Sequence, residues 1–328
     1  MYLSYQGYKH RLQLVDESTF EFRNSTLASQ FVGTNISDPI INLVSSLFAI
    51  TDSNKYPENP KKSNRNLVYF TVNSDKDYLK MLRVCLRSII SNASSLKNID
   101  FIVISDSFPE YISLRDEFPE INLYFRQVKK PADGIAASMN KLRIFELFPY
   151  FDEYQKILFL DCDIVFNQDI QKIFTLELKD SKIYSIIHDE YHRATINTKY
   201  HNLIKFNQEI VDSLNSSGIT PFNAGQFLMR ASQKMARHFQ NINLIRELWQ
   251  GDFFFEQSFM NTYFNYNFAS DTKLLDDFFC LFYIGDNAIN SLTLDKSKNI
   301  HYAGDPCNGS TKLEFLKSEF PNYYDILT

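Results

Sequence analysis

Between residues 67 and 264 the chain alternates short apolar runs with longer segments whose apolar residues recur every three or four positions. The short runs have the length and composition of buried strands, and the periodic segments have the spacing of helices that bury one face. Regular alternation of the two favours a sheet whose strands are mostly parallel, with helices on both faces. The sequence therefore predicts an α/β fold.

The predicted elements follow one another in a simple order. Strands are expected at residues 67–72, 101–104, 123–128, 157–160, 183–187 and 222–229. Helices are expected at residues 77–92, 139–148, 232–249 and 253–264. In the first helix, Leu79, Leu82, Leu86 and Ile89 are spaced three, four and three apart and so share one face.

The first 65 residues lack this alternation, and we expect them to form an N-terminal extension and linker. The best element in the extension is a short helix over residues 40–50, with Asp38 as its N-cap and Pro39 at its first position. Residues 54–66 are polar and hold two prolines, which is typical of a linker. The catalytic domain is accordingly placed at residues 66–328.

Composition narrows the class of protein. With 328 residues, 44% apolar and 22% charged, the chain has the make-up of a globular enzyme, and a net charge of -5 gives no reason to expect a nucleic-acid partner. Its four cysteines contain no CxxC pair, which favours a reducing compartment. No apolar run reaches the roughly 18 residues of a membrane span and no leader pattern opens the chain, so a cytoplasmic location is expected.

The most informative stretch is KILFLDCDIVF, residues 156–166, where an apolar run leads directly into two aspartates. Residues two apart in extended backbone point the same way, so Asp161 and Asp163 should converge while Cys162 turns back into the protein. Paired carboxylates suit Mg²⁺ or Mn²⁺ at a nucleotide diphosphate. A plain surface turn is the alternative, since Asp-x-Asp is common, but the apolar run before it favours a site.

Ligands of open α/β sheets bind beyond the carboxyl ends of the strands. The loops after Val72, Leu160 and Ile187 should therefore border one crevice. That arrangement would bring Asn73 close to the two aspartates.

Several further segments keep the order of a known family. They read FTVNSDKDY (70–78), MNKLRIFEL (139–147), LDCDIVFNQDI (160–170), PFNAGQFLM (221–229), FFFEQSFMNTYF (253–264) and NIHYAGD (299–305). Together they resemble the nucleotide-sugar glycosyltransferases of the GT-A fold, and among them the retaining family 8 that includes glycogenin and bacterial galactosyltransferases. The resemblance implies a GT-A sheet with Rossmann-like topology.

The resemblance also implies roles for individual residues. It implies a Mn²⁺ or Mg²⁺ cofactor, a UDP-sugar donor and a hydroxyl acceptor on a glycan, a protein or a small molecule. The metal ligands would be Asp161, Asp163 and His301. The donor contacts would be Thr71, Asn73, Tyr78, Lys141, Asp161, Gly225, Gly304 and Lys312, and the catalytic residues Asn223, Glu256 and Gln257.

Some of these residues have simpler explanations. A lysine at position 141 can lie on a solvated helix face, and a single histidine such as His301 is often a structural residue. A glycine inside a strand pattern, as at Gly225, marks a bulge or a close approach whether or not a ligand is present.

The sequence departs from the family in two places. Glu256 stands where the family usually has aspartate, and bulky residues precede it. The family's Lys-Pro-Trp after the glycine of the last motif is missing, and residues 306–312 read PCNGSTK instead. Lys312 could replace the missing lysine from a longer loop, or Gly309, Ser310 and Thr311 could supply hydrogen-bond donors to the diphosphate.

Two other functions fit parts of the sequence. An apolar strand followed by Asp-x-Asp also opens the haloacid dehalogenase phosphatases, and Gly285-Asp286-Asn287 faintly resembles their later acidic motif. Against this, about 90 residues of α/β pattern precede Asp161. The absence of Lys-Pro-Trp would also suit a sugar-nucleotide or glycan-binding protein without catalysis.

Overall fold

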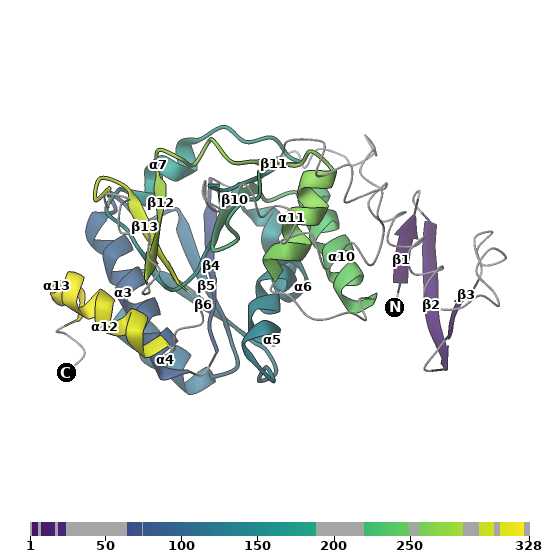
Figure 1. The fold of residues 1–328 in the computed structure, drawn as a ribbon, viewed down its shortest axis with the longest axis horizontal. Coiled ribbons are helices and arrows are strands. Elements are labelled where there is room, and N and C mark those ends of the chain that lie inside the picture. Colours follow the sequence, from purple (N-terminus) through teal and green to yellow (C-terminus); the bar gives the residue numbers. More distant parts are fainter. Residues whose placement is uncertain are drawn as a thin grey trace.

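The computed structural model describes residues 2–5, 8–16, 19–23, 64–73, 75–187, 220–248, 256–284, 295–304 and 309–324. Its centre is a seven-stranded sheet (Figure 1). In sheet order the strands are β11 (Ser270–Asp271), β9 (Ile183–Tyr184), β10 (Gln226–Arg230), β7 (Lys156–Leu160), β4 (Asn66–Thr71), β5 (Ile99–Ser105) and β6 (Asn122–Gln127). All neighbouring strands pair in parallel except at β10, which is antiparallel to β7 and β9. The predicted mostly parallel α/β fold is therefore confirmed.

The central strand β7 is apolar throughout because it separates two hydrophobic cores. Ile157 and Phe159 face one core, whereas Leu158 and Leu160 face the other. All four side chains are fully buried. A strand covered on both faces reads as a continuous apolar run, which is why the sequence pattern located it.

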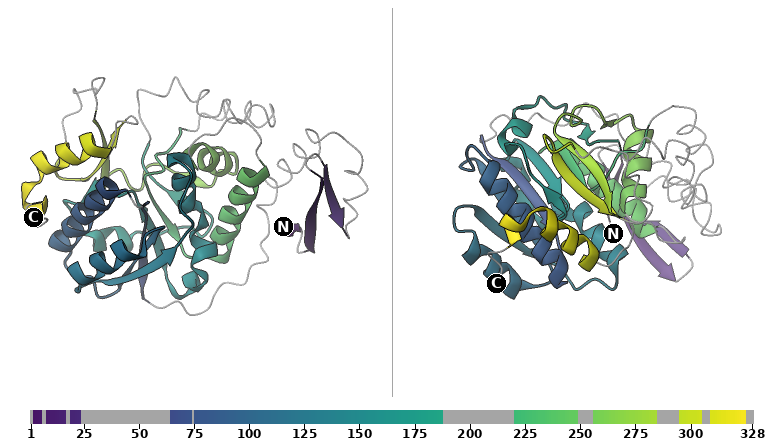
Figure 2. Two further views of the ribbon diagram at one scale, coloured as in Figure 1. Left: turned by 90° about the horizontal axis from the view of Figure 1, so that it is seen from below. Right: turned by 60° about the vertical axis from the view of Figure 1, so that its left-hand side comes forward.

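Helices cover both faces of the sheet (Figures 1 and 2). The core on one side includes residues of η1 (Met139–Arg143), α6 (Ile144–Leu147), η2 (Pro149–Glu153), α10 (Gln233–Leu248) and α11 (Glu256–Tyr266), with α5 (Gly134–Ser138) packed against it. The core on the other side includes residues of α3 (Lys76–Asn92), α4 (Phe108–Glu117), α7 (Ile170–Thr175) and α12 (Gly309–Glu319).

A second, three-stranded sheet brings a distant part of the chain to the end of β7. Its strands are β12 (Phe279–Ile284), β13 (Asn299–Gly304) and β8 (Ile164–Val165), in that order. β8 begins directly after Asp163, and β13 pairs with it so that His301 lies opposite Ile164. The register of this pairing places His301 beside the two aspartates.

The C-terminal helices α12 and α13 (Pro321–Tyr324) are anchored to α3, as Figure 2 shows for α12. Arg87 of α3 donates a hydrogen bond from Nη1 to the Tyr323 carbonyl oxygen at 2.6 Å. Leu313 and Leu316 of α12 are buried in the core that α3 lines. The position of α12 relative to β7 is therefore fixed through α3.

Some predicted elements differ from the structure. Residues 139–148, predicted as one helix, form the 3-10 helix η1 followed by the short helix α6. Three strands that were not predicted, β1 (Tyr2–Tyr5), β2 (Tyr8–Asp16) and β3 (Thr19–Arg23), form an antiparallel sheet in the extension. The predicted helix at residues 40–50 lies outside the described residues. No helix in the described parts of the chain has the length and apolar character that crossing a membrane requires.

Candidate functional site

The site is built around the two aspartates that follow β7. The Asp161 amide donates a 2.6 Å hydrogen bond to the Gly225 carbonyl oxygen, which holds the end of β7 against the segment before β10. Asp163 is 5% exposed, and a third of the Asp161 side chain reaches solvent. Cys162 between them is buried in the core, as alternation along an extended chain predicts.

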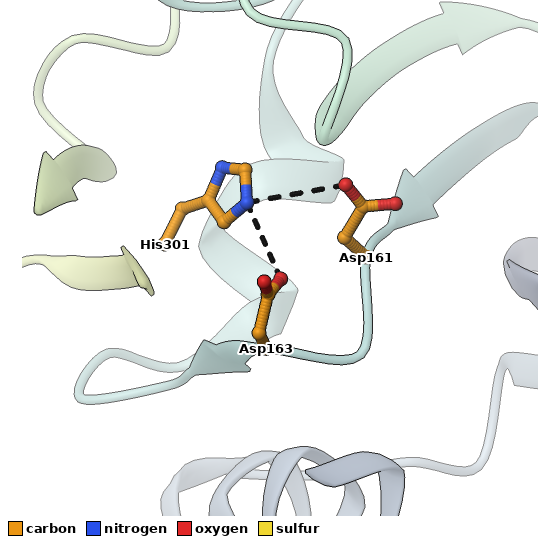
Figure 3. A group of neighbouring side chains, drawn as sticks. All are labelled: Asp161, Asp163 and His301. Atoms are coloured by element: carbon orange, nitrogen blue, oxygen red, sulfur yellow. Dashed lines mark ion pairs between the residues drawn. The ribbon is translucent and has the colours of Figure 1, made fainter. Parts of the chain in front are cut away.

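His301 completes the group (Figure 3). Its Nε2 atom lies 3.3 Å from Asp163 Oδ1 and 3.9 Å from Asp161 Oδ2. Its other ring nitrogen, Nδ1, lies 3.1 Å from Asn223 Oδ1, an oxygen that already accepts a 2.7 Å hydrogen bond from the Gly225 amide. An acceptor at this position suits a proton on Nδ1, which leaves Nε2 as the ring nitrogen that a cation could use.

These three side chains fit a divalent cation. One potential ligand atom from each of them lies within 4.8 Å of the other two. Among the described residues, Asp163 Oδ1 is buried without a hydrogen-bond partner, and such an oxygen is costly unless a ligand or ion satisfies it. Two carboxylate oxygens and one imidazole nitrogen form a donor set that Mn²⁺ and Mg²⁺ accept.

Gly225 is required by the close packing at this point. A Cβ atom built there would lie 2.1 Å from His301 Cε1 and 2.8 Å from Asp161 Oδ2. Neither neighbour can move away without leaving the group. The close approach that a glycine in a strand pattern predicts is therefore present, and it is made to two candidate metal ligands.

Lys141 of η1 is buried beside Asp161 and does not lie on a solvated helix face, so that simpler alternative is wrong. Its Nζ atom contacts Glu256 Oε1 at 2.6 Å, Asp161 Oδ1 at 3.2 Å and the Ala224 carbonyl oxygen at 3.1 Å. Burial by itself lowers the pKa of the ammonium group, but the two carboxylates outweigh it and raise the pKa above its usual value. Lys141 is thus a charged link between β7 and α11.

Lys312 forms an ion pair with Asp163, as Lys141 does with Asp161. Its Nζ atom lies 2.7 Å from Asp163 Oδ2, and its side chain is 12% exposed. Burial lowers the pKa of Lys312, but the Asp163 carboxylate outweighs it and raises the pKa above the usual range. Lys312 belongs to the first turn of α12 and not to a loop, while its role at the diphosphate stays a prediction.

The two aspartates differ in their electrostatics. Burial raises the pKa of Asp161, Lys141 and His301 oppose it, and the neighbouring carboxylates of Asp163 and Glu256 add to it, so the net shift is upward. Burial also acts to raise the pKa of Asp163, but Lys312 and His301 outweigh it and the pKa falls below its usual range. Asp163 is therefore the more strongly ionised of the two.

The structure also describes the other residues nominated from the sequence. Gln257 Oε1 accepts a 3.0 Å hydrogen bond from the Ala224 amide, and Asn73 Oδ1 accepts one of 3.4 Å from the Asp75 amide. Thr71 ends β4, the neighbour of β7, and Gly304 ends β13. Tyr78 is half-buried, and burial raises the pKa of its hydroxyl.

Sequence reasoning missed two contributors to the site. The backbone of Ala224 contacts both Lys141 and Gln257, a role that its methyl side chain could not signal. Ser185 is buried and donates to the carbonyl oxygens of Asn223 and Gln226, which fixes the backbone on either side of Gly225. A serine inside the apolar run of residues 183–187 was the available signal for it.

A match to a family model shows which protein family this chain belongs to. The model of glycosyl transferase family 8 matches residues 70–312, well over half of the chain. This chain belongs to glycosyl transferase family 8. As a member it is a glycosyltransferase that uses a nucleotide-sugar donor, and the family normally uses a divalent metal. The phosphatase is therefore wrong, and family membership favours an enzyme over a binding protein without catalysis. Gly285-Asp286-Asn287 lies outside the described residues.

One solved structure with a TM-score above 0.5 supports the fold, and two others have lower scores. The bifunctional glycosyltransferase WbbM, in its apo structure, is similar with a TM-score of 0.53 and 19% identity, over 81% of this chain and 52% of that chain. This chain thus spans about half the length of WbbM. The galactosyltransferase LgtC with donor and acceptor sugar analogues has a TM-score of 0.49 and 14% identity, over 79% of this chain and 99% of LgtC. Mouse xyloside xylosyltransferase 1 has a TM-score of 0.47 and 13% identity, over 75% and 99% of the two chains. No curated protein sequence matches this chain.

Proposed function

We propose that this family 8 enzyme transfers a sugar from a UDP-sugar to a hydroxyl acceptor, with retention of the anomeric configuration and with Mn²⁺ or Mg²⁺ as cofactor. The observation that carries the proposal is the group formed by Asp161, Asp163 and His301, in which Nε2 of His301 faces one oxygen of each carboxylate. The catalytic domain is residues 66–328, and residues 1–65 are an extension to it.

In this proposal Asp161 Oδ2, Asp163 Oδ1 and His301 Nε2 hold the cation. A bound cation would supply positive charge to offset the negative charge on the leaving nucleoside diphosphate. Thr71, Asn73 and Tyr78 take the base and ribose. The diphosphate is bound by Gly304, Lys312 and the first turn of α12, because backbone amides at a helix N-terminus attract an anion.

The donor sugar lies against the segment between Asn223 and Gly225 and against the first turn of α11. Lys141 holds Glu256 by an ion pair of 2.6 Å, and the Ala224 amide orients Gln257. An amide is a poor nucleophile, and a carboxylate paired with a buried ammonium is a weakened one. Both points support attack by the acceptor from the face that the diphosphate leaves, through a transition state with oxocarbenium character.

In this same-face mechanism the leaving phosphate takes the acceptor's proton and Gln257 orients the sugar. We expect Gln257→Ala to lower the rate about 10- to 100-fold without trapping a glycosyl-enzyme, because only positioning is lost. Glu256 is the nucleophile if a two-step route operates. Mass spectrometry of peptides from the working enzyme separates the two, since a glycosylated peptide containing Glu256 would replace the same-face mechanism.

The proposal is tested in two stages. A thermal-shift screen of nucleotide-sugars with and without Mn²⁺ should show the largest rise in melting temperature for a UDP-sugar with the metal, because a ligand that binds only the folded state stabilises it. NMR of the product made from that donor should then show the donor's own anomeric configuration. Stabilisation by another nucleotide would refute the UDP assignment, and an inverted product would refute retention.

A further inference from the structure

The two aspartates share a pattern that metal binding alone does not explain. Each carboxylate gives one oxygen to a lysine and turns the other toward His301 Nε2. Asp161 uses Oδ1 for Lys141, at 3.2 Å, and Oδ2 faces His301 at 3.9 Å. Asp163 uses Oδ2 for Lys312, at 2.7 Å, and Oδ1 faces His301 at 3.3 Å. Each lysine thus contacts the carboxylate oxygen that would not bind a cation.

The lysines reduce the negative charge that a cation meets. Three carboxylates, those of Asp161, Asp163 and Glu256, lie together with the two ammonium groups of Lys141 and Lys312. The formal charges of these five side chains add up to one negative unit. The affinity of an oxygen site for a divalent cation rises with the number of its uncompensated charges, so this site is a weak one until further anionic oxygens arrive.

The two lysines are held very differently. Lys141 contacts three acceptors and its side chain is 4% exposed, so it stays in place. The hydrogen bonds and ion pairs that Lys312 Nζ makes to other described residues go to Asp163 alone. Lys312 also stands in the first turn of α12, where backbone amides attract an anion. It is therefore the cation of the pair that can exchange one anionic partner for another.

We propose that Lys312 is the counter-ion of Asp163 in the enzyme without nucleotide, and that it turns to the diphosphate when metal and nucleotide bind. Lys312 then weakens the binding of a divalent cation to the free enzyme and strengthens the binding of the nucleotide together with the cation. This coupling rests on the proposed function, because it assigns the diphosphate to the same end of α12. It makes the metal and the nucleotide bind interdependently.

The test is a calorimetric titration of the full chain with MnCl₂ alone, and with UDP in saturating Mn²⁺. A charge at this distance changes the proton affinity of a neighbouring carboxylate by one to three pKa units, so we expect Lys312→Met to lower the Kd for Mn²⁺ alone at least about tenfold. The same variant should raise the Kd for UDP at least about tenfold. Lys312→Arg keeps the charge and should stay close to the wild type in both titrations.

Lys317→Met is the matched control, because Lys317 lies on the same helix and is exposed. It should change neither constant. Weaker UDP binding with unchanged Mn²⁺ binding in Lys312→Met would reduce Lys312 to a simple phosphate contact, and weaker binding of both would make it structural. Either outcome overturns the coupling. A wild type that does not bind UDP would refute the proposed donor instead, while the MnCl₂ titration would still decide whether Lys312 is the counter-ion of Asp163.

Discussion

Each half of the site pairs an aspartate with a lysine, but the contacts and the pKa shifts differ between the two halves. On the β7 side Asp161 shares Lys141 with Glu256. On the side of the second sheet Asp163 is the sole partner of Lys312 among the described residues. The pKa is raised at the first aspartate and lowered at the second, although the two are only two residues apart. The motif places the carboxylates, but their electrostatics depend on burial and on the charged side chains that other elements bring to them.

The largest expected effect tests whether both halves serve one metal. We expect Asp161→Asn and Asp163→Asn each to lower metal-dependent transfer by at least about 10³-fold, because each removes an anionic oxygen that the cation needs. Circular dichroism should show an intact fold, since each carboxylate lies at the end of β7 and outside the apolar cores. The loss of transfer activity is measured as the decrease in the rate of UDP release. Turnover near wild type in either variant would mean that the two halves do not share a metal.

A smaller loss of activity is expected from a change at Gly225, which lies between Asp161 and His301. Gly225→Ala would push a Cβ atom onto His301 of one half and Asp161 of the other, at 2.1 Å and 2.8 Å. We expect Mn²⁺ affinity and transfer to fall about 100-fold, because a misplacement of about 1 Å can cost that much. Gly134→Ala is the control, since nothing lies within 4 Å of a Cβ atom there. Equal activity of the two variants would contradict the close packing.

The comparison also explains how far the sequence could predict the site. The apolar run before Asp161 and the alternation of strand and helix patterns were sufficient for the sheet, because such patterns report local burial. The partners of the aspartates were not readable, since Lys141 lies 20 residues before Asp161 and Lys312 lies 149 residues after Asp163. His301 was nominated through a family resemblance. Its approach to Asp163 depends on the pairing of β8 with β13, which no local pattern specifies.

The third prediction separates the two lysines by their effect on stability. Lys141→Met should lower the free energy of unfolding by about 3–5 kcal/mol, because it leaves two carboxylates near each other without their buried cation. Lys312→Met should cost less, since Lys312 has one partner among the described residues and Lys141 has three. Urea unfolding in metal-free buffer measures both.

A second substitution shows whether the stability lost in Lys141→Met comes from charge or from packing. Adding Glu256→Gln to Lys141→Met removes one of the stranded carboxylates and should recover part of the lost stability. No recovery in the double variant would indicate that packing of the lysine stem matters more than its charge.

The smallest expected effect is also the most direct test of the difference between the aspartates. The pKa of Asp161 is raised by burial and by neighbouring carboxylates, so its ionised form at neutral pH destabilises the folded state. The pKa of Asp163 is lowered by Lys312 and His301, so its ionised form stabilises the folded state above the usual pKa of an aspartate and loses that effect as the pH falls. In metal-free buffer at about pH 7 we therefore expect Asp161→Asn to raise the melting temperature and Asp163→Asn to lower it.

The shifts should amount to a few degrees, since 1 kcal/mol moves the melting temperature of a domain of this size by roughly 2–4 °C. The rise at Asp161 should be the smaller of the two, because a third of its side chain reaches solvent. At about pH 4 the deficit of Asp163→Asn should narrow, because the wild-type carboxylate begins to lose its advantage there. Differential scanning calorimetry at the two pH values measures these changes, and shifts of the same sign in both variants would show that the two halves are electrostatically alike.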